Sequence, residues 1–166
     1  MSNIVIMGVA GCGKSSLGQA LAAALGWRYI EGDAHHAPAS IAKMRAGIAL
    51  TDADRSGWLD ELGRMLAATP NGQVLACSAL KRRYRDQLRA ACPGLRFVFL
   101  EISHALALQR VAARAEQHLF PATLVDSQFA ALESPVGEPG VLRLDAALPP
   151  EQQRREAQAW LQGDAA

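Results

Sequence analysis

Two hydrophobic spacings alternate along this chain. Short, continuous apolar runs are typical of buried strands, whereas apolar residues that recur every three or four positions mark one face of a helix. The runs predict strands at residues 3–7, 27–30, 74–77, 95–102 and 141–144. The longer period predicts helices at residues 17–25, 51–66, 81–91, 105–114, 122–132 and 151–161. Residues 34–50 show no clear period, and we expect them to be irregular or only partly helical.

The alternation of strands and helices indicates an α/β fold. Repeated β-α units place parallel strands in one sheet, with right-handed crossovers that lay helices on both of its faces. We therefore expect three α/β/α layers with a mostly parallel five-stranded sheet. A chain of 166 residues is long enough for one well-buried domain and short for two. We expect a single domain over residues 1–166, with a small mobile lid at about residues 114–127.

Composition narrows the class of partner. Lys and Arg number 17 against 16 Asp and Glu, so the net charge of +1 gives no general attraction to nucleic acid or to anionic membranes. Small molecules are the expected partners. The three cysteines show no spacing typical of disulfide frameworks or metal sites. With no basic leader before the first strand and no apolar run near the roughly 20 residues of a membrane span, a soluble cytoplasmic protein is expected.

Residues 8–15 read GVAGCGKS and match the phosphate-loop pattern G-x-x-x-x-G-K-[ST], between a predicted strand and a predicted helix. The glycines allow backbone N–H groups to converge on phosphate oxygens at the positive end of the helix. Lys14 should reach the β- and γ-phosphates of ATP, and the Ser15 hydroxyl should ligate Mg²⁺. The motif therefore predicts a P-loop NTPase fold. The expected nucleotide-binding residues are Gly8, Val9, Ala10, Gly11, Cys12, Gly13, Lys14, Ser15 and Ser16.

A P-loop serves GTPase switches, ATPase motors and kinases alike, so other residues must separate these classes. The chain has no Asn-Lys-x-Asp guanine signature, and Thr51 with Asp54 has the form of a helix cap rather than a switch. The strand at residues 74–77 runs into Ser78 without the acidic residue expected of a motor ATPase. These observations favour a small-molecule kinase.

Three further residues are candidates for the chemistry of phosphoryl transfer. Asp33 follows the second predicted strand, at the edge of the sheet where α/β folds bind ligands, and it could orient or deprotonate an acceptor hydroxyl. Arg110 and Arg114 are one helical turn apart and precede a polar segment, from which both could neutralise charge on the nucleotide. For isolated arginines, a solvated helix face is the alternative.

Motifs along nearly the whole chain resemble those of the gluconokinases, a family of shikimate-kinase-like P-loop kinases. Besides the P-loop they are EGDAHH at residues 31–36, LTDADRSGWL at 50–59, CSALKRRYRDQLR at 77–89, His118, and SQFAALESP at 127–135. The resemblance implies transfer of the γ-phosphate of ATP to the 6-hydroxyl of D-gluconate, with Mg²⁺ as cofactor and often a homodimer. The lid departs from the family pattern, because residues 114–120 are one residue longer and lack its glycine.

The same resemblance implies a substrate site, carried over position by position. The second-strand aspartate of the family matches Asp33, and its acidic-arginine pair matches Asp54-Arg55. Its basic motif after a strand matches Ser78, Lys81, Tyr84 and Arg85. For His35 and His36 we expect substrate-loop contacts rather than metal binding, since adjacent residues seldom share one metal. The residues expected to contact gluconate are Asp33, His36, Arg55, Ser78, Lys81, Arg85 and His118.

Gluconate offers a carboxylate that needs a cationic partner and hydroxyls that need short polar groups. We hypothesise that Arg55 holds the carboxylate, with Lys81 or Arg85 as alternatives. A solvated helix face is the simpler explanation for the basic run at residues 81–85, and we expect at least two of its four cations to be no more than that.

Two other functions remain open from the sequence. A related kinase could act on shikimate or on a nucleoside monophosphate, and a nucleotide-binding regulator could use the P-loop without phosphorylating a metabolite. The dependence of ATP turnover on each acceptor distinguishes the three.

Overall fold

The structure is a computed structural model, and it describes residues 2–69, 71–114 and 122–163. Its centre is a sheet of five strands in the order β2-β3-β1-β4-β5. The strands are β1 (Ile4–Met7), β2 (Arg28–Glu31), β3 (Gln73–Ala76), β4 (Arg96–Glu101) and β5 (Val141–Asp145). Every pairing between neighbouring strands is parallel. The predicted α/β fold with its five-stranded sheet is confirmed.

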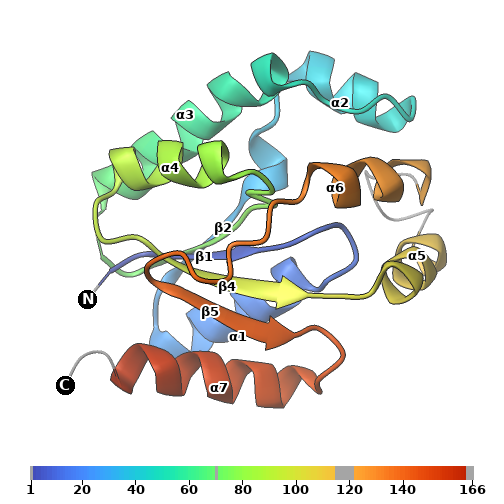
Figure 1. Ribbon diagram of the computed structural model, residues 1–166. Helices are drawn as coiled ribbons and strands as arrows, with labels where there is room; N and C mark the ends of the chain where they lie inside the picture. Colours follow the sequence, from blue (N-terminus) through green and yellow to red (C-terminus); the bar gives the residue numbers. More distant parts are fainter. Residues whose placement is uncertain (1, 70, 115–121, 164–166) are drawn as a thin grey trace.

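Helices cover both faces of this sheet (Figure 1). α3 and α4 lie on one face, α1 and α7 lie on the other, and α5 and α6 lie beyond the carboxyl end of β4. The helices are α1 (Lys14–Leu25), α2 (Pro38–Arg45), α3 (Asp52–Ala68), α4 (Arg82–Ala91), α5 (His104–Ala113), α6 (Val125–Ala131) and α7 (Pro150–Gly163), with 3-10 turns η1 (Gly32–His35) and η2 (Ala122–Leu124). In the part of the chain that the structure describes, no helix is long and apolar enough to cross a membrane.

Alternating side chains of each strand build a core on either side of the sheet. In β1, Ile4 and Ile6 belong to the core beneath α1 and α7, whereas Val5 and Met7 belong to the core beneath α3 and α4. All four side chains are fully buried. Because both faces of a parallel sheet are covered, its strands read as continuous apolar runs rather than as alternating ones. This burial explains the short apolar runs in the sequence.

Local signals set several element boundaries. The Asp54 amide donates to the Thr51 hydroxyl while the Thr51 amide donates to the Asp54 carboxylate, so the predicted capping box begins α3. Gly26 ends α1 in the left-handed conformation, with φ of 69°. Pro38 stands in the first turn of α2, which spans Pro38–Arg45, so residues 34–50 are partly helical as expected. The helix predicted at residues 122–132 is a 3-10 turn followed by the short helix α6.

The topology gathers three segments at the carboxyl edge of the sheet. The P-loop joins β1 to α1, Asp33 lies in η1 directly after β2, and Ser78 follows β3. Because β1, β3 and β2 are successive neighbours in a parallel sheet, these segments emerge side by side. A ligand that bridges the P-loop and Asp33 would therefore cross the ends of adjacent strands.

Candidate active site

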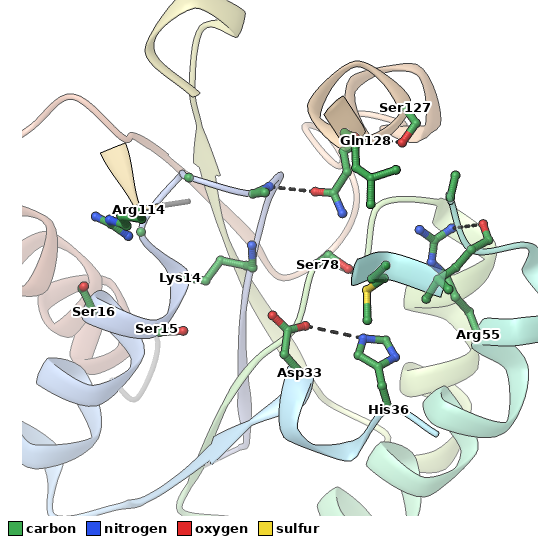
Figure 2. Close-up of a pocket in the computed structure, with 17 residues that line it drawn as sticks. Lys14, Ser15, Ser16, Asp33, His36, Arg55, Ser78, Arg114, Ser127 and Gln128 are labelled. Carbon is green, nitrogen blue, oxygen red and sulfur yellow. Dashed lines mark hydrogen bonds and ion pairs between the residues drawn. The ribbon is translucent and has the colours of Figure 1, made fainter. Parts of the chain in front are cut away.

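A cavity of about 270 Å³ opens at this edge of the sheet. Figure 2 shows Lys14 and Asp33 in its middle, with the P-loop on one side and Arg55 of α3 on the other. The lining residues that the sequence predicted for a site are Ala10, Gly11, Gly13, Lys14, Ser15, Ser16, Asp33, His36, Arg55, Ser78 and Arg114. The structure thus brings the expected phosphate-binding and acceptor-binding residues to one space.

Glycines give the P-loop its shape. Gly8 has φ of 147°, and a Cβ there would lie 2.8 Å from the Leu100 carbonyl oxygen. Gly11 has φ of 84°, and a Cβ there would lie 3.0 Å from the Ala107 carbonyl oxygen. A side chain at either position would meet both a strained backbone and a neighbouring main chain. Gly8 therefore lies against β4 and Gly11 against α5, and this packing sets the path of the loop.

The loop presents amide groups that fit phosphate oxygens. Within the described chain, the amides of Gly11, Gly13 and Lys14 have no hydrogen-bond acceptor, whereas the Ala10 amide donates to Gln128 Oε1 at 2.7 Å. Free amides at the positive end of α1 are the usual cradle for a nucleotide phosphate. In the part of the chain that the structure describes, the Lys14 ammonium donates only to the Val9 carbonyl oxygen, at 3.2 Å. The P-loop therefore fits the triphosphate of ATP.

Other residues of the loop form its back rather than its binding face. Gly8, Val9 and Cys12 do not line the cavity, although all three were expected to bind nucleotide. Cys12 is buried, and this burial raises the pKa of its thiol despite the nearby charge of Lys14. These three residues support the loop from beneath.

Ser15 lies where a metal ion would join the phosphates. Its hydroxyl donates to Glu31 Oε2 at 2.6 Å, and the Tyr29 hydroxyl donates to the same oxygen at 2.6 Å. Burial, and then the hydrogen bond to Glu31, raise the pKa of Tyr29, so its proton stays in place. Because the Ser15 proton points to Glu31, the lone pairs of its oxygen remain for a cation. Ser15 therefore fits a magnesium ion that keeps waters and phosphate oxygens as its other ligands.

Asp33 is held by an aromatic stack. His36 Nε2 lies 3.5 Å from Asp33 Oδ1, and the His36 ring stacks on Trp58 with centroids 4.0 Å apart and planes at 21°. Trp58 in turn donates from Nε1 to the Gly32 carbonyl oxygen at 2.8 Å, which ties the stack to the turn that carries Asp33.

The surroundings of the two His36 ring nitrogens also indicate its tautomer. His36 Nδ1 is buried and has no partner among the described residues. A proton on Nε2 faces the Asp33 carboxylate, whereas a proton on Nδ1 would be buried without an acceptor. We infer the Nε2–H tautomer, in which His36 orients Asp33. The neighbouring His35 does not line the cavity, and its Nδ1 lies 3.5 Å from Glu61 Oε1.

Arg55 lines the cavity, and only one nitrogen of its guanidinium has a hydrogen-bond partner among the described residues. Nη1 donates to the Leu50 carbonyl oxygen at 3.3 Å and to the Tyr84 hydroxyl at 3.2 Å. Nε and Nη2 have no acceptor in the described parts of the chain. These two N–H groups lie along one side of the planar group and can bind both oxygens of a carboxylate. Arg55 is therefore suited to the role that the sequence suggested.

Arg85 was a candidate for the same role, and the structure argues against it. Its side chain is 0% exposed and forms a salt bridge of 2.6 Å with Glu138. Nε and Nη2 donate to the Glu138 carboxylate, Nη1 donates to Ala79 and Leu80, and Nη2 also donates to Glu133. The five N–H groups of Arg85 are thus matched by five acceptors from the protein. No donor is left for a substrate, and Arg85 does not line the cavity.

Lys81 lies in a recess beside the cavity instead of in it. Its ammonium pairs with Asp52 at 3.0 Å, and the hydrogen bond from Lys81 helps to lower the pKa of Asp52 after that from Tyr84. The side chains of Arg82 and Arg83 are 61% and 68% exposed. The expectation that at least two of the four cations form a solvated helix face is confirmed by Arg82 and Arg83.

Arg110 lies in α5 and Arg114 directly follows it, and the two arginines have different surroundings. Arg114 lines the cavity at the end of the helix, whereas Arg110 does not. Arg110 donates to the Gly11 carbonyl oxygen at 3.2 Å and to the Ala146 carbonyl oxygen at 3.0 Å, so it joins the P-loop to the segment after β5. His118 and the other residues of the expected lid at 115–121 lie outside the described residues.

Three polar residues of the site were not expected from the sequence. Glu31 contacts the Ser15 hydroxyl, while Ser127 and Gln128 line the cavity from α6. Gln128 is 8% exposed and holds the P-loop through the Ala10 amide. Each stands at the start of a motif that carried the family resemblance, EGDAHH or SQFAALESP. The motifs were therefore a signal for these positions, without indicating their partners.

Comparisons with known proteins agree with this geometry. A family model described as an AAA domain matches residues 4–139. The gluconokinase of Gluconobacter oxydans (strain 621H) is 45% identical over 145 residues, covering 85% of this chain and 80% of the relative. The chain belongs to the gluconokinase family.

Solved structures of similar proteins support the membership. A gluconokinase from Sinorhizobium meliloti 1021 has a TM-score of 0.87 and 47% identity, covering 95% of this chain and 90% of that one. An unliganded sugar kinase from Janibacter sp. HTCC2649 has a TM-score of 0.91 and 38% identity, covering 98% of this chain and 95% of that one. The P-loop kinase fold is thus shared with gluconokinases and a sugar kinase over nearly the whole chain.

Proposed function

We propose that this chain is an ATP-dependent kinase that phosphorylates the 6-hydroxyl of D-gluconate and releases 6-phospho-D-gluconate and ADP. The observation that carries the proposal is the edge of Arg55 in the same cavity as the P-loop and Asp33. A cation with two parallel donors suits the carboxylate at one end of gluconate. In Figure 2, Asp33 lies between Arg55 and Lys14, where a hydroxyl at the other end of the acceptor would meet the γ-phosphate.

The residues divide the work of phosphoryl transfer. The acceptor oxygen forms a bond to the γ-phosphorus while the bond from that phosphorus to the bridging oxygen of ADP breaks, and the hydroxyl proton passes to Asp33. Lys14 and the free amides of the P-loop stabilise negative charge on the phosphate oxygens. Arg114 adds a second positive charge from the end of α5. Ser15 would hold Mg²⁺, which would supply positive charge to offset that of the phosphates.

An acceptor assay tests this function. The purified protein receives MgATP together with gluconate, shikimate or a nucleoside monophosphate, and ADP release is followed by a coupled reaction. We expect turnover that depends on gluconate. We also expect Asp33→Asn to lower kcat by about 10²- to 10⁴-fold, the usual contribution of a positioned base. Glu61→Gln is the matched control, because Glu61 is a half-exposed carboxylate that contacts the neighbouring His35.

The assay also identifies the alternatives. ADP release that occurs only with shikimate or with a nucleoside monophosphate would overturn the choice of gluconate. If no acceptor stimulates ADP release, the nucleotide-binding regulator is the better explanation. If Asp33→Asn retains full activity, Asp33 has no part in the transfer step.

We further propose that the protein acts in the cytoplasm as a homodimer. Its three cysteines are buried and form no disulfide, which suits a reducing compartment. The dimer rests on the family resemblance alone, and a light-scattering mass of one chain would contradict it.

A further inference from the structure

A chain of hydrogen bonds runs behind Arg55, away from the cavity. Arg55 Nη1 donates to the Tyr84 hydroxyl at 3.2 Å, and the Tyr84 hydroxyl donates to Asp52 Oδ1. Arg55 and Asp52 stand three residues apart in the first turn of α3, so both side chains lie on the face that packs on α4. Tyr84 reaches them from α4. A buried hydroxyl therefore joins two oppositely charged residues of one helix.

The direction of each bond is fixed by the chemistry of the groups. Arg55 can only donate, and the ionised Asp52 can only accept, so the Tyr84 hydroxyl must accept from the first and donate to the second. Tyr84 is 3% exposed, which leaves little room for water to replace either partner. The guanidinium carbon of Arg55 also lies 5.5 Å from the centroid of the Tyr84 ring.

Asp52 is kept ionised by several donors. Hydrogen bonds from Tyr84 first, and then from Lys81, hold the pKa of Asp52 below its usual value. Lys81 Nζ and Arg83 Nη1 lie 3.0 Å from its two oxygens. A carboxylate that accepts a hydrogen bond from the Tyr84 hydroxyl makes the Tyr84 oxygen a stronger acceptor for Arg55, because linked hydrogen bonds polarise one another.

We call the hydrogen bonds from Arg55 through Tyr84 to Asp52 the relay. The relay determines which N–H groups of Arg55 remain free to bind the acceptor. Nη1 is occupied by Tyr84 and by the Leu50 carbonyl oxygen, so the guanidinium plane cannot rotate without losing both contacts. Nε and Nη2 then remain as a fixed pair of donors on a residue that lines the cavity. Without Tyr84, the long Arg55 side chain would sample other rotamers, and ordering it would become part of the free energy of binding.

We propose that Tyr84 is a positioning residue that sets the Arg55 edge for the carboxylate of the acceptor, with Asp52 fixing the direction of the Tyr84 hydroxyl. This inference rests on the proposed function, in which Arg55 binds that carboxylate. Tyr84 does not line the cavity, so it acts on the acceptor only through Arg55. The relay thereby makes the preference for an acidic acceptor depend on a residue of α4 that the acceptor never touches.

A double-mutant cycle tests the relay, with Tyr84→Phe, Arg55→Ala and the combined variant assayed with MgATP and gluconate. We expect Tyr84→Phe to raise the gluconate KM by about tenfold, the usual effect of a lost hydrogen bond to a charged group, with a smaller change in kcat. The ATP KM should be unchanged. In the Arg55→Ala background, Tyr84→Phe should add nothing further, because its only route to the acceptor is gone.

Arg83→Met is the matched control. It removes one hydrogen-bond donor from Asp52 but leaves the hydrogen bonds from Arg55 through Tyr84 to Asp52 intact. The Arg83 side chain is exposed, so its loss should disturb the packing of α4 little. The gluconate KM of Arg83→Met should stay within about twofold of the wild type. Circular dichroism and thermal unfolding establish that each variant is folded at the assay temperature.

The outcomes separate the relay from the function on which it rests. An unchanged gluconate KM in Arg55→Ala would overturn the assignment of the carboxylate to Arg55, and the relay with it. A raised KM in Arg55→Ala with an unchanged KM in Tyr84→Phe would overturn the relay alone. Effects of Tyr84→Phe that persist in the Arg55→Ala background would show a general structural role for Tyr84 and would also overturn the relay.

Discussion

The two sides of the cavity hold their ligands by different means. On the P-loop side, the groups that meet the phosphates are mainly backbone amides, fixed by left-handed glycines and by the start of α1. On the α3 side, the groups proposed to meet the acceptor are charged ends of side chains, each contacted by another side chain. His36 orients Asp33, and Tyr84 orients Arg55. One side is therefore shaped by main-chain geometry and the other by a network of contacts between distant segments.

This difference has a functional consequence. Backbone amides point at the phosphates whatever side chains follow them, and every nucleotide triphosphate presents the same oxygens. A guanidinium or carboxylate has to be oriented by its neighbours, and a single substitution in a neighbour changes the fit. We therefore expect substitutions on the P-loop side to lower turnover with any acceptor. Substitutions of Arg55 or Tyr84 on the α3 side should affect the choice and the affinity of the acceptor, whereas substitution of Asp33, which meets the reacting hydroxyl, should lower turnover.

The largest effect should come from Lys14→Met, which removes the charged side chain of the P-loop itself. Lys14 touches only the Val9 carbonyl oxygen within the described residues, so its charge is available to the phosphates. We expect kcat to fall on the order of 10⁴-fold, the range seen when a cation that stabilises the transferred phosphoryl group is lost. Coupled ADP release with several acceptors measures it.

Lys43→Met is the control for that substitution. Lys43 pairs with Asp54 at 2.9 Å on the α3 side, so its loss should leave the ATP KM unchanged. A loss of activity in Lys14→Met that occurred only with gluconate would contradict the division between the two sides.

A smaller effect, on stability rather than on turnover, should follow Arg85→Met. Burial raises the pKa of Glu138, but the hydrogen bonds from Arg85 and Arg89 outweigh burial and lower it, so a charged carboxylate is held inside the protein. Removing Arg85 leaves that charge with Arg89 alone. We expect the free energy of unfolding, measured in urea, to fall by about 3–5 kcal/mol.

Arg82→Met provides the comparison on the same helix. Arg82 is 61% exposed and lies 3.7 Å from Asp86, so the expected change is within about 0.5 kcal/mol. The gluconate KM of folded Arg85→Met should stay within about threefold of the wild type. A stable Arg85→Met with a sharply raised gluconate KM would restore Arg85 as a substrate ligand.

The same division explains what could be predicted from the sequence. The strands and the P-loop are encoded by local patterns, a buried apolar run or glycines at fixed spacing, and these predictions are confirmed. The P-loop motif predicts its structure because main-chain geometry depends on the residues within it. The capping box of Thr51 and Asp54 was equally readable, since its two halves are three residues apart.

The ion pairs and hydrogen bonds between distant segments could not be predicted in this way. Arg85 and Glu138 are 53 residues apart, and no local pattern indicates which arginine of a basic helix will meet a buried carboxylate. A partial signal existed, because Arg85 follows Tyr84 and precedes Leu88 by three positions, on the face that proves to be buried. The contact between Ser15 and Glu31 likewise depends on the pairing of separate elements. Long-range contacts of this kind arise from tertiary packing.

The smallest effect should be the pH dependence of the contact between α2 and α3. The Thr51 amide first, and then Lys43, lower the pKa of Asp54 to about 2, against about 3.9 in an unfolded chain. Because the folded value is the lower one, Asp54 stabilises the fold above about pH 4, and this contribution is lost as the pH falls toward 2.

Asp54→Asn should therefore lower Tm at pH 6, with the difference shrinking by pH 2 to 3. Thermal unfolding of both proteins across that range measures the effect, and in a Lys43→Met background only the part due to the Thr51 amide should remain. A difference in Tm that is equally large at pH 2 would show that packing, and not the charge of Asp54, holds α2 against α3.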